Sequence, residues 1–259
     1  MDDSFGTVAE GISMISVTIL TKNSRRYLKE VLDALRSFDE VVIYDTGSTD
    51  DTLDIAEHFP NVKIYQGPLI GFGPTHNIAS HQAKNDWILS IDSDEVPSPE
   101  MVQTIHSLEL DPRNVYSFPR HNYYKGQWIR GCGWYPDRQI RLYNRLETSF
   151  SHDQVHETVL TKNKKHIPLK TALKHYSYDS VTDFLQKMQN YSDLFAIQHA
   201  GKKYSSPLKA LGHASFAFFK SYILKRGFLE GYAGFLISSY NAHTTLYKYF
   251  KLYERNKIN

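Results

Sequence analysis

Short apolar runs alternate with amphipathic segments along the first part of the chain. Residues 12–20, 40–45, 62–65 and 87–91 are apolar runs rich in β-branched side chains, a pattern typical of strands buried on both faces. The segments between them predict helices near residues 24–35, 53–59 and 76–83. Strands that alternate with helices in this way predict an α/β fold with a mostly parallel sheet.

Polar side chains follow three of these predicted strands at the point where each strand ends. Thr21 follows the first strand, Asp45 ends the second, and Asp92 and Asp94 follow the fourth. Ligands of open parallel sheets bind beyond the carboxyl ends of the strands. We therefore expect one crevice in which the three polar segments converge.

The acidic segment after the fourth strand is a candidate cation site. Asp92 and Asp94, followed by Glu95, place several carboxylate oxygens within reach of one point. Hard divalent cations such as Mg²⁺ and Mn²⁺ prefer these ligands and complete their shell with water and phosphate oxygens. Two acids at this spacing also fit a solvated turn, but their position at the end of an apolar strand favours the cation.

Composition and missing motifs narrow the function. The chain has 41% apolar and 22% charged residues, which suits a globular protein, and its single cysteine, Cys132, excludes a disulfide scaffold. A net charge of +2 argues against a general nucleic-acid binder, so no nucleic-acid partner is expected. No G-x-G-x-x-G sequence follows the first strand and no P-loop is present, so neither nucleotide-binding motif applies.

The second half of the chain predicts two further strands, residues 115–124 and 139–143, around a segment rich in glycine and aromatic residues. This segment, residues 125–136, fits either a long hairpin with buried aromatics or a platform on which a sugar ring stacks. Arg138 and Arg141 carry guanidinium groups that suit phosphate.

Four titratable side chains then lie within six residues, at His152, Asp153, His156 and Glu157. On a helix the two histidines would share a face and resemble a zinc site, but the flanking residues favour a strand or a loop. A carboxylate of this cluster fits the role of general base, and a polar surface turn is the third interpretation.

The C-terminal part predicts helices and a basic surface. Residues 181–195 have apolar side chains at helical spacing, and residues 194–229 contain no acidic side chain. Basic residues in this region are interleaved with aromatic and aliphatic ones, which suits either an interfacial helix on an anionic bilayer or a helix packed on the catalytic domain. The basic residues are Lys202, Lys203, Lys209, Lys220, Lys225 and Arg226.

We expect two domains, an α/β domain over residues 12–175 and a helical extension over residues 176–259. No run reaches the ~18 apolar residues of a membrane span, and the N-terminus lacks the basic region of a signal peptide. The expected location is the cytoplasm, with the helical extension on the inner face of the cytoplasmic membrane if it binds lipid.

Several segments together resemble the family 2 inverting glycosyltransferases of GT-A fold. The resemblance is carried by residues 15–23 (ISVTILTKN), 41–52 (VVIYDTGSTDDT) and 87–95 (WILSIDSDE). It implies a mostly parallel twisted sheet flanked by helices, a C-terminal helical extension and a nucleotide-sugar donor. The segments that extend it toward the lipopolysaccharide-core β-glucosyltransferases of Gram-negative bacteria are residues 72–74, 137–143, 155–157 and 225–234.

The resemblance also implies roles for individual residues. Asp94 would bind a Mn²⁺ or Mg²⁺ ion on the donor diphosphate, with Asp92 and His156 as further ligands. Inverting transfer needs one general base, for which Glu157 is preferred and Asp153 is the alternative. The residues expected at the nucleotide sugar are Leu20, Thr21, Lys22, Asp45, His76, Asn77, Asp92 and Ser93. Those expected at the acceptor are Trp134, Asp137 and Arg138.

The function implied by the resemblance is transfer of a hexose, glucose from UDP-glucose, to a sugar hydroxyl of lipopolysaccharide core or a similar lipid-linked oligosaccharide. Two alternatives stay open from the sequence. One is the same chemistry on a polyprenyl phosphate, and the other is a non-catalytic membrane adaptor that binds a nucleotide sugar. The Asp92–Asp94 pair argues against the adaptor.

Overall fold

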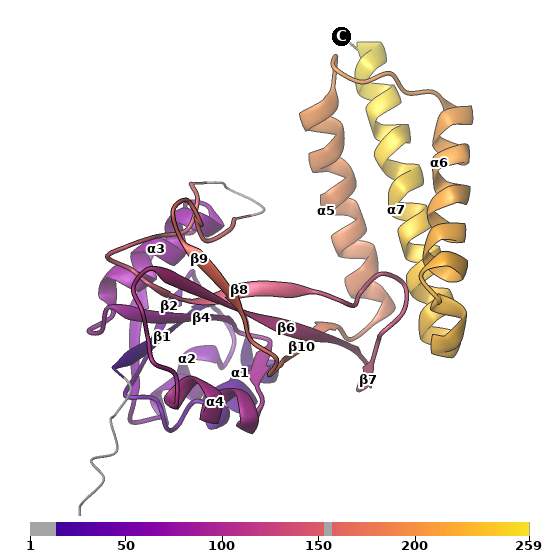
Figure 1. The fold of residues 1–259 in the computed structure, drawn as a ribbon. Helices are drawn as coiled ribbons and strands as arrows, with labels where there is room; N and C mark the ends of the chain where they lie inside the picture. Colours follow the sequence, from indigo (N-terminus) through magenta and orange to yellow (C-terminus); the bar gives the residue numbers. More distant parts are fainter. Residues whose placement is uncertain (1–13, 153–156, 259) are drawn as a thin grey trace, which may run out of the picture. The chain divides into compact units, whose positions relative to one another are not determined.

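The computed structural model describes residues 14–152 and 157–258, which fall into two compact units (Figure 1). The first unit contains the described residues up to Pro119 and the segment Arg138–Leu173. The second contains Arg120–Asp137 and the chain from Lys174 onward. The sequence prediction placed one boundary at residue 175 and kept residues 120–137 with the sheet.

A mostly parallel sheet forms the centre of the first unit. Its strands are β1 (Ile15–Thr21), β2 (Glu40–Asp45), β3 (Val62–Gln66), β4 (Trp87–Asp92), β5 (Glu95–Pro97), β6 (Asn114–Tyr124), β8 (Arg138–Asn144) and β9 (Lys165–Pro168). The order β3-β2-β1-β4 is parallel and confirms the four predicted strands. β8 lies antiparallel between β4 and β6, and β9 pairs with β6 in parallel.

Helices connect the parallel strands, as the alternating pattern predicts. They are α1 (Arg25–Ala34), α2 (Thr52–Glu57), α3 (Phe72–Gln82) and α4 (Pro99–His106). In the view of Figure 1, α3 lies above the sheet and α4 below it. Helix α3 begins four residues before the predicted start at His76, since Pro74 is tolerated in the first turn, where backbone N–H groups have no partner within the helix.

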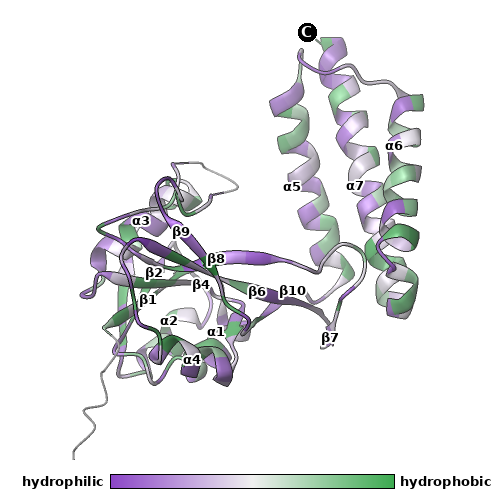
Figure 2. Cartoon of the chain, in the orientation of Figure 1, coloured by the Kyte–Doolittle hydropathy of each residue, from purple (hydrophilic) through white to green (hydrophobic). Residues whose placement is uncertain are grey.

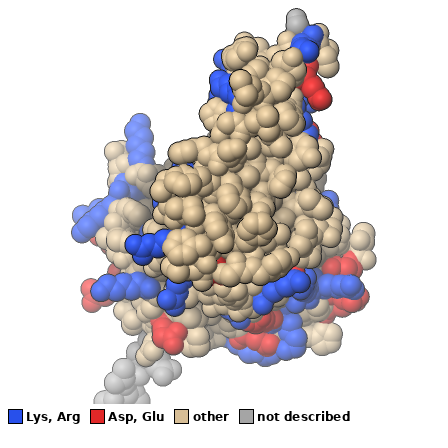
Figure 3. All heavy atoms as spheres, turned by 90° about the vertical axis from the view of Figure 1, so that its right-hand side faces the viewer, with Lys and Arg blue, Asp and Glu red and all other residues tan. Residues whose placement is uncertain are grey.

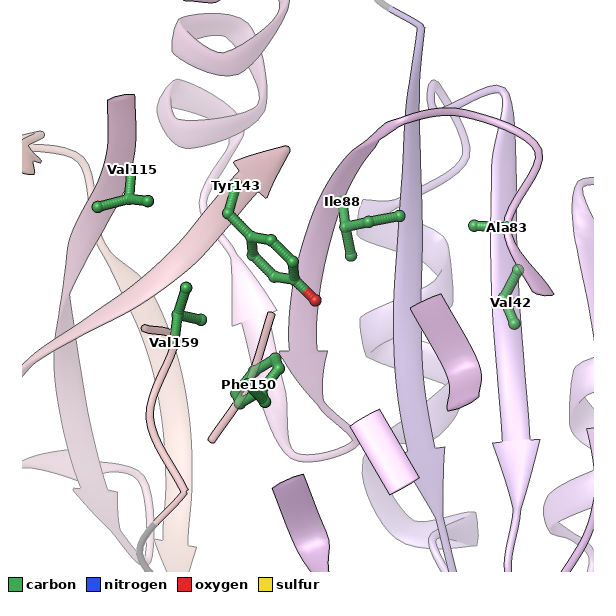
Figure 4. Close-up of a cluster of buried hydrophobic side chains, with 7 residues drawn as sticks. All are labelled: Val42, Ala83, Ile88, Val115, Tyr143, Phe150 and Val159. Atoms are coloured by element: carbon green, nitrogen blue, oxygen red, sulfur yellow. The ribbon is translucent and has the colours of Figure 1, made fainter. Parts of the chain in front are cut away.

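One cluster of buried side chains ties the sheet to the segment that precedes the titratable cluster (Figure 4). Tyr143 of β8 is fully buried, and its hydroxyl lies 2.8 Å from the hydroxyl of Ser80 on α3. Phe150 and Val159 pack in the same cluster and pair as an antiparallel bridge. The two residues therefore anchor both ends of the chain segment that carries residues 152–157. The other members are Val42, Ala83, Ile88 and Val115.

The second unit is mainly helical. Its elements are β7 (Gln127–Trp128), β10 (Leu173–Tyr178), α5 (Val181–His199), α6 (Pro207–Phe219), the π-helix η1 (Lys220–Leu224), the 3-10 helix η2 (Gly227–Glu230) and α7 (Gly231–Ile258). Helix α5 starts with a capping box, in which Ser180 and Asp183 satisfy each other's backbone N–H groups. The core of the unit centres on Phe184, whose ring stacks 4.0 Å from that of Tyr178. No helix among the described residues is long and apolar enough to cross a bilayer.

Candidate active site

Three strands of the first unit end in register at one edge of the sheet. Thr21 at the end of β1 pairs with Asp45 at the end of β2, and Leu20 pairs with Asp92 at the end of β4. The parallel ladder forces this alignment, because neighbouring strands that run in one direction carry their carboxyl ends to the same edge. The predicted convergence of the three polar segments is therefore present in the structure.

Asp45 fixes the loop that follows β2. Its carboxylate is fully buried and accepts four hydrogen bonds, from the Thr21 hydroxyl at 2.9 Å, the Gly47 N–H at 3.0 Å, and the Ser48 N–H and hydroxyl at 2.9 and 2.5 Å. Burial by itself raises the pKa of Asp45, but these hydrogen bonds outweigh it and leave the pKa below its ordinary value. The four bonds use all lone pairs of the carboxylate, so Asp45 holds the loop after β2 in a fixed conformation.

Side-chain hydrogen bonds also join the loops to one another. The Asn23 side-chain oxygen accepts from the Thr49 N–H at 2.8 Å, and the Ser48 hydroxyl accepts from the Asn23 N–H at 2.8 Å. The Ser24 hydroxyl lies 2.8 Å from the hydroxyl of Ser93, the residue between Asp92 and Asp94. The loops after β1, β2 and β4 thus form one connected rim, along which Lys22 is exposed.

Asp92 shares a buried guanidinium with Glu95. The Arg141 Nη2 donates to the Asp92 Oδ2 at 2.6 Å and to the Glu95 Oε1 at 2.5 Å. Arg141 is 6% exposed and Glu95 is fully buried, whereas the Asp92 side chain is 38% exposed. The sequence interpretation of Glu95 as a cation ligand and of Arg141 as a phosphate contact missed this pair. A charged residue within the apolar strand β8 was the available signal, because a buried charge needs a partner.

Arg141→Met should lower the free energy of unfolding by about 3–5 kcal/mol, because it leaves the carboxylate of Glu95 buried without its counter-ion. Chemical denaturation followed by circular dichroism measures the loss. Arg138→Met is the matched control on the same strand, since the exposed Arg138 donates to neutral groups, the Ser117 carbonyl and hydroxyl and the Leu169 carbonyl. Equal losses in the two variants would contradict the assigned role of the buried pair.

The donor set for a divalent cation is small. Asp94 is half-buried at the rim. The Asp92 side chain is partly exposed, and its Oδ2 forms the ion pair with Arg141. Within residues 14–152 and 157–258, no three His, Cys, Asp or Glu side chains form a group that could hold a metal. His156, the third predicted ligand, lies outside the described residues. One or two carboxylates fit Mg²⁺ or Mn²⁺ when phosphate oxygens and water supply the remaining ligands.

His76 lies inside the protein beneath this rim. It is 3% exposed, its ring stacks on Phe150 with centroids 4.4 Å apart, and its Nδ1 lies 3.3 Å from the Ser90 hydroxyl. Burial lowers the pKa of His76; the charge of Asp92 opposes this effect, that of Arg141 adds to it, and the pKa lies at about 4. The imidazole is therefore neutral at pH 7 and presents no positive charge to a diphosphate.

Acidification should weaken the first unit through His76. The unfolded chain binds this proton near pH 6.5 and the folded protein only near pH 4, so the stability present above pH 6.5 is lost as the pH falls toward 4. The expected loss from this group is about 3 kcal/mol. Urea unfolding at a series of pH values should show it in the wild type and not in His76→Gln. Parallel pH profiles of the two proteins would refute the contribution of His76.

Asn77, the neighbour of His76, holds the chain that leads to the titratable cluster. Its side-chain amide donates to the Phe150 carbonyl at 3.1 Å and accepts from the Phe150 N–H at 2.9 Å. The Ser151 N–H donates to the Thr158 carbonyl at 2.8 Å, so the chain before residue 152 and the chain after residue 157 lie side by side. Glu157 is half-buried next to this pairing, whereas Asp153 and His156 fall outside the described residues.

The predicted acceptor residues are divided between the two units. Trp134 packs in the core of the second unit, with its ring stacked 5.5 Å from that of Tyr178. Asp137 forms an ion pair with Arg120 at 2.8 Å in the same unit. Arg138 belongs to the first unit. Trp134 thus contributes to a hydrophobic core, as in the hairpin interpretation, whereas Tyr135 of the same segment is exposed.

Comparison with known proteins assigns this site to a family. The profile of "Glycosyl transferase family 2" matches residues 16–165, more than half of the chain. An "Uncharacterized glycosyltransferase" of Rickettsia felis is 29% identical over 264 residues, which cover 93% of this chain and 89% of that protein. "Lipopolysaccharide core biosynthesis glycosyltransferase LpsC" of Rhizobium meliloti is 23% identical over 201 residues, which cover 73% of each chain.

Among solved structures, S. aureus TarS 1-349 in complex with UDP-GlcNAc covers 94% of this chain and 91% of that one, with a TM-score of 0.47 and 18% identity. The family match covers the parallel sheet and its flanking helices described above, so the expected GT-A fold is confirmed. The matched segment contains the rim, the Asp92–Asp94 pair and Glu157. The chain belongs to glycosyl transferase family 2.

Proposed function

We propose that the protein is a metal-dependent inverting glycosyltransferase that moves glucose from UDP-glucose to a sugar hydroxyl of lipopolysaccharide core or a similar lipid-linked oligosaccharide. The observation that carries the proposal is the connected rim, which ends at Asp92 and Asp94. A relative whose printed name concerns lipopolysaccharide core biosynthesis supports the choice of acceptor.

The donor would lie along the rim. Leu20 and Thr21 end the inner strand β1 and Lys22 follows it, and the ordered loop after Asp45 offers backbone groups to the base and ribose. Ser93 hydrogen-bonds to Ser24 and so holds the loop between the two acidic residues in place. His76 and Asn77 would serve the donor indirectly, because their side chains pack against or bind Phe150.

Asp94, with Asp92 and His156, would hold Mn²⁺ or Mg²⁺ against the donor diphosphate. The bound ion would offset the negative charge that develops as the diphosphate leaves the sugar. The Arg141 guanidinium donates to the Asp92 carboxylate at 2.6 Å and so orients it.

Transfer with inversion is a single displacement. Glu157, or alternatively Asp153, accepts the proton of the acceptor hydroxyl while that oxygen attacks the anomeric carbon from the face opposite the diphosphate. The bond from the anomeric carbon to the diphosphate oxygen breaks, and UDP leaves with the electron pair. One carboxylate is sufficient, because no covalent sugar–enzyme intermediate forms.

The acceptor would meet the protein through Trp134, Asp137 and Arg138, with the lipid part of the molecule held at the cytoplasmic face of the membrane. Trp134 and Asp137 would act by shaping the loop that carries them, since both have partners within the second unit. A glycolipid acceptor requires the enzyme to work at a membrane surface, as a peripheral protein of the inner leaflet.

A radiolabelled UDP-glucose assay tests this function. The full chain is incubated with Mn²⁺ and either core-truncated lipopolysaccharide or a polyprenyl phosphate. We expect label in the lipopolysaccharide and none in the polyprenyl phosphate. Label in the polyprenyl phosphate alone would replace the proposed acceptor, and UDP-glucose binding without transfer to either would favour a non-catalytic adaptor.

A further inference from the structure

One end of the helical unit exposes an unusual number of large apolar side chains. We call residues 216–235 the tip; they comprise the end of α6, both short helices η1 and η2, and the start of α7. Leu229 is 67% exposed, and Leu224 is 58% exposed. Figure 2 shows that the hydrophobic residues of α6 gather toward η1. The other exposed apolar residues of the tip are Phe216, Phe219, Ile223, Phe228, Tyr232 and Phe235.

The exposed charged residues of the tip are all basic. Lys220, Lys225 and Arg226 are exposed between the apolar side chains. The one acidic residue, Glu230, accepts hydrogen bonds from the Arg130 N–H at 2.9 Å, the Gly131 N–H at 2.7 Å and the Gln127 side chain at 3.1 Å. Figure 3 shows that the face of the helical unit turned to the viewer carries almost no charged side chain.

Backbone contacts hold the tip in this exposed form. Gly234 lies so close to η2 that a Cβ there would meet the Gly227 carbonyl oxygen, and a Cβ at Gly227 would meet the Ser221 carbonyl oxygen, which explains two of the three glycines of residues 225–234. The Cys132 N–H donates to the Lys225 carbonyl at 2.9 Å, and the Ser238 hydroxyl donates to that of Ser221 at 2.9 Å. The backbone at the tip is therefore pinned from several sides, with its apolar side chains on the surface.

We propose that the tip inserts into the interfacial region of an anionic lipid bilayer. This docking surface would bring the proposed glycosyltransferase to its glycolipid acceptor, so the proposal rests on that function. Exposed apolar patches rimmed by basic side chains suit anionic headgroups, since the apolar groups enter the acyl boundary while lysine and arginine reach the phosphates. A second copy of the chain fits less well, because it would bring Lys220, Lys225 and Arg226 against the same three charges.

Vesicle sedimentation tests the electrostatic half of the proposal. The full chain is mixed with vesicles of phosphatidylcholine alone or of phosphatidylcholine with phosphatidylglycerol. We expect binding to the anionic vesicles, weakened by salt, and about 100-fold weaker binding by the triple variant Lys220→Gln, Lys225→Gln, Arg226→Gln, at about fivefold per residue. Lys202→Gln, which changes an exposed basic residue in the connection between α5 and α6, is the control and should bind like the wild type.

An environment-sensitive probe tests insertion. Because Cys132 is buried, a thiol-reactive fluorescent label will react with a newly introduced, exposed cysteine. The cysteine replaces Leu229 in the tip or, as the control, Leu185 on α5, which is 55% exposed. The emission maximum of the probe at position 229 should shift to shorter wavelength with anionic vesicles, and that of the probe at position 185 should not. No shift at either position, or equal shifts at both, would overturn insertion by the tip.

A soluble acceptor separates this proposal from the enzymatic one. Delipidated core oligosaccharide should accept glucose equally from the wild type and from Leu229→Ser, while transfer to vesicle-bound glycolipid should fall in the variant. Loss of neither activity would overturn the docking role and leave the transferase proposal standing. Absence of transfer to both acceptors, with vesicle binding intact, would refute the transferase and keep the docking. A dimer lost in Leu229→Ser, without lipid binding, would assign the tip to a second copy.

Discussion

Replacing Glu157 with Gln is expected to lower kcat for hexose transfer by about 10²–10⁴-fold, with little change in the affinity for UDP. The amide cannot accept the proton of the attacking hydroxyl, and general base catalysis contributes about this factor. The side chain differs by a single group, so the half-buried position of Glu157 is preserved. Initial rates with labelled donor give kcat, and calorimetric titration with UDP gives the affinity.

Asp153→Asn is the matched variant in the same segment. A small effect of this substitution beside a large effect of Glu157→Gln identifies the base as Glu157. The reverse pattern would assign the base to Asp153, and two unaffected variants would contradict a carboxylate base in this segment. Asn77, which fixes Phe150 by two hydrogen bonds, keeps the start of the segment in place for either candidate.

Asp94→Asn is expected to lower transfer by about 10²-fold or more, because it removes charge that would hold the cation against the leaving diphosphate. The variant should also bind UDP more weakly when Mn²⁺ is present and like the wild type when EDTA is present. Isothermal titration in both buffers separates the two effects. Asp33→Asn, a surface aspartate that pairs with Lys29 on α1, is the control and should behave as the wild type.

Full turnover of the wild type in EDTA would contradict the metal role whatever the variant does. Full turnover of Asp94→Asn in Mn²⁺ would assign the metal to other residues. Asp92→Asn is an informative comparison, because it also removes one of the anionic partners of the buried Arg141 guanidinium. We expect Asp92→Asn to lose stability as well as activity.

The centre of the sheet was predictable because β1, β2 and β4 are buried on both faces. β1 and β4 lie inside the parallel sheet, so a nearly continuous apolar run was required at residues 15–20 and 87–91, and such runs are visible in the sequence. The edge where Thr21, Asp45 and Asp92 meet follows from parallel pairing alone. The convergence of the candidate site was therefore inferred without knowledge of any side-chain contact.

The partners of individual side chains were not predictable in the same way. Arg141 and Glu95 are 46 residues apart, and only the packing of β8 against β4 brings them together. His76 was expected at the donor, yet its pairing with Phe150 depends on a bridge to Val159 that local sequence does not encode. The aromatic side chain of Trp134 also fitted two environments, and the core of the second unit holds it.

Proton nuclear magnetic resonance of the product tests the central claim most directly. The purified chain is incubated with UDP-glucose, Mn²⁺ and core oligosaccharide, and the coupling constant of the new anomeric proton is measured. The inverting mechanism predicts a β-linked glucose and one UDP released for each linkage formed. An α-linked product, or transfer that persists in the double variant Asp92→Asn, Asp94→Asn, would contradict the account.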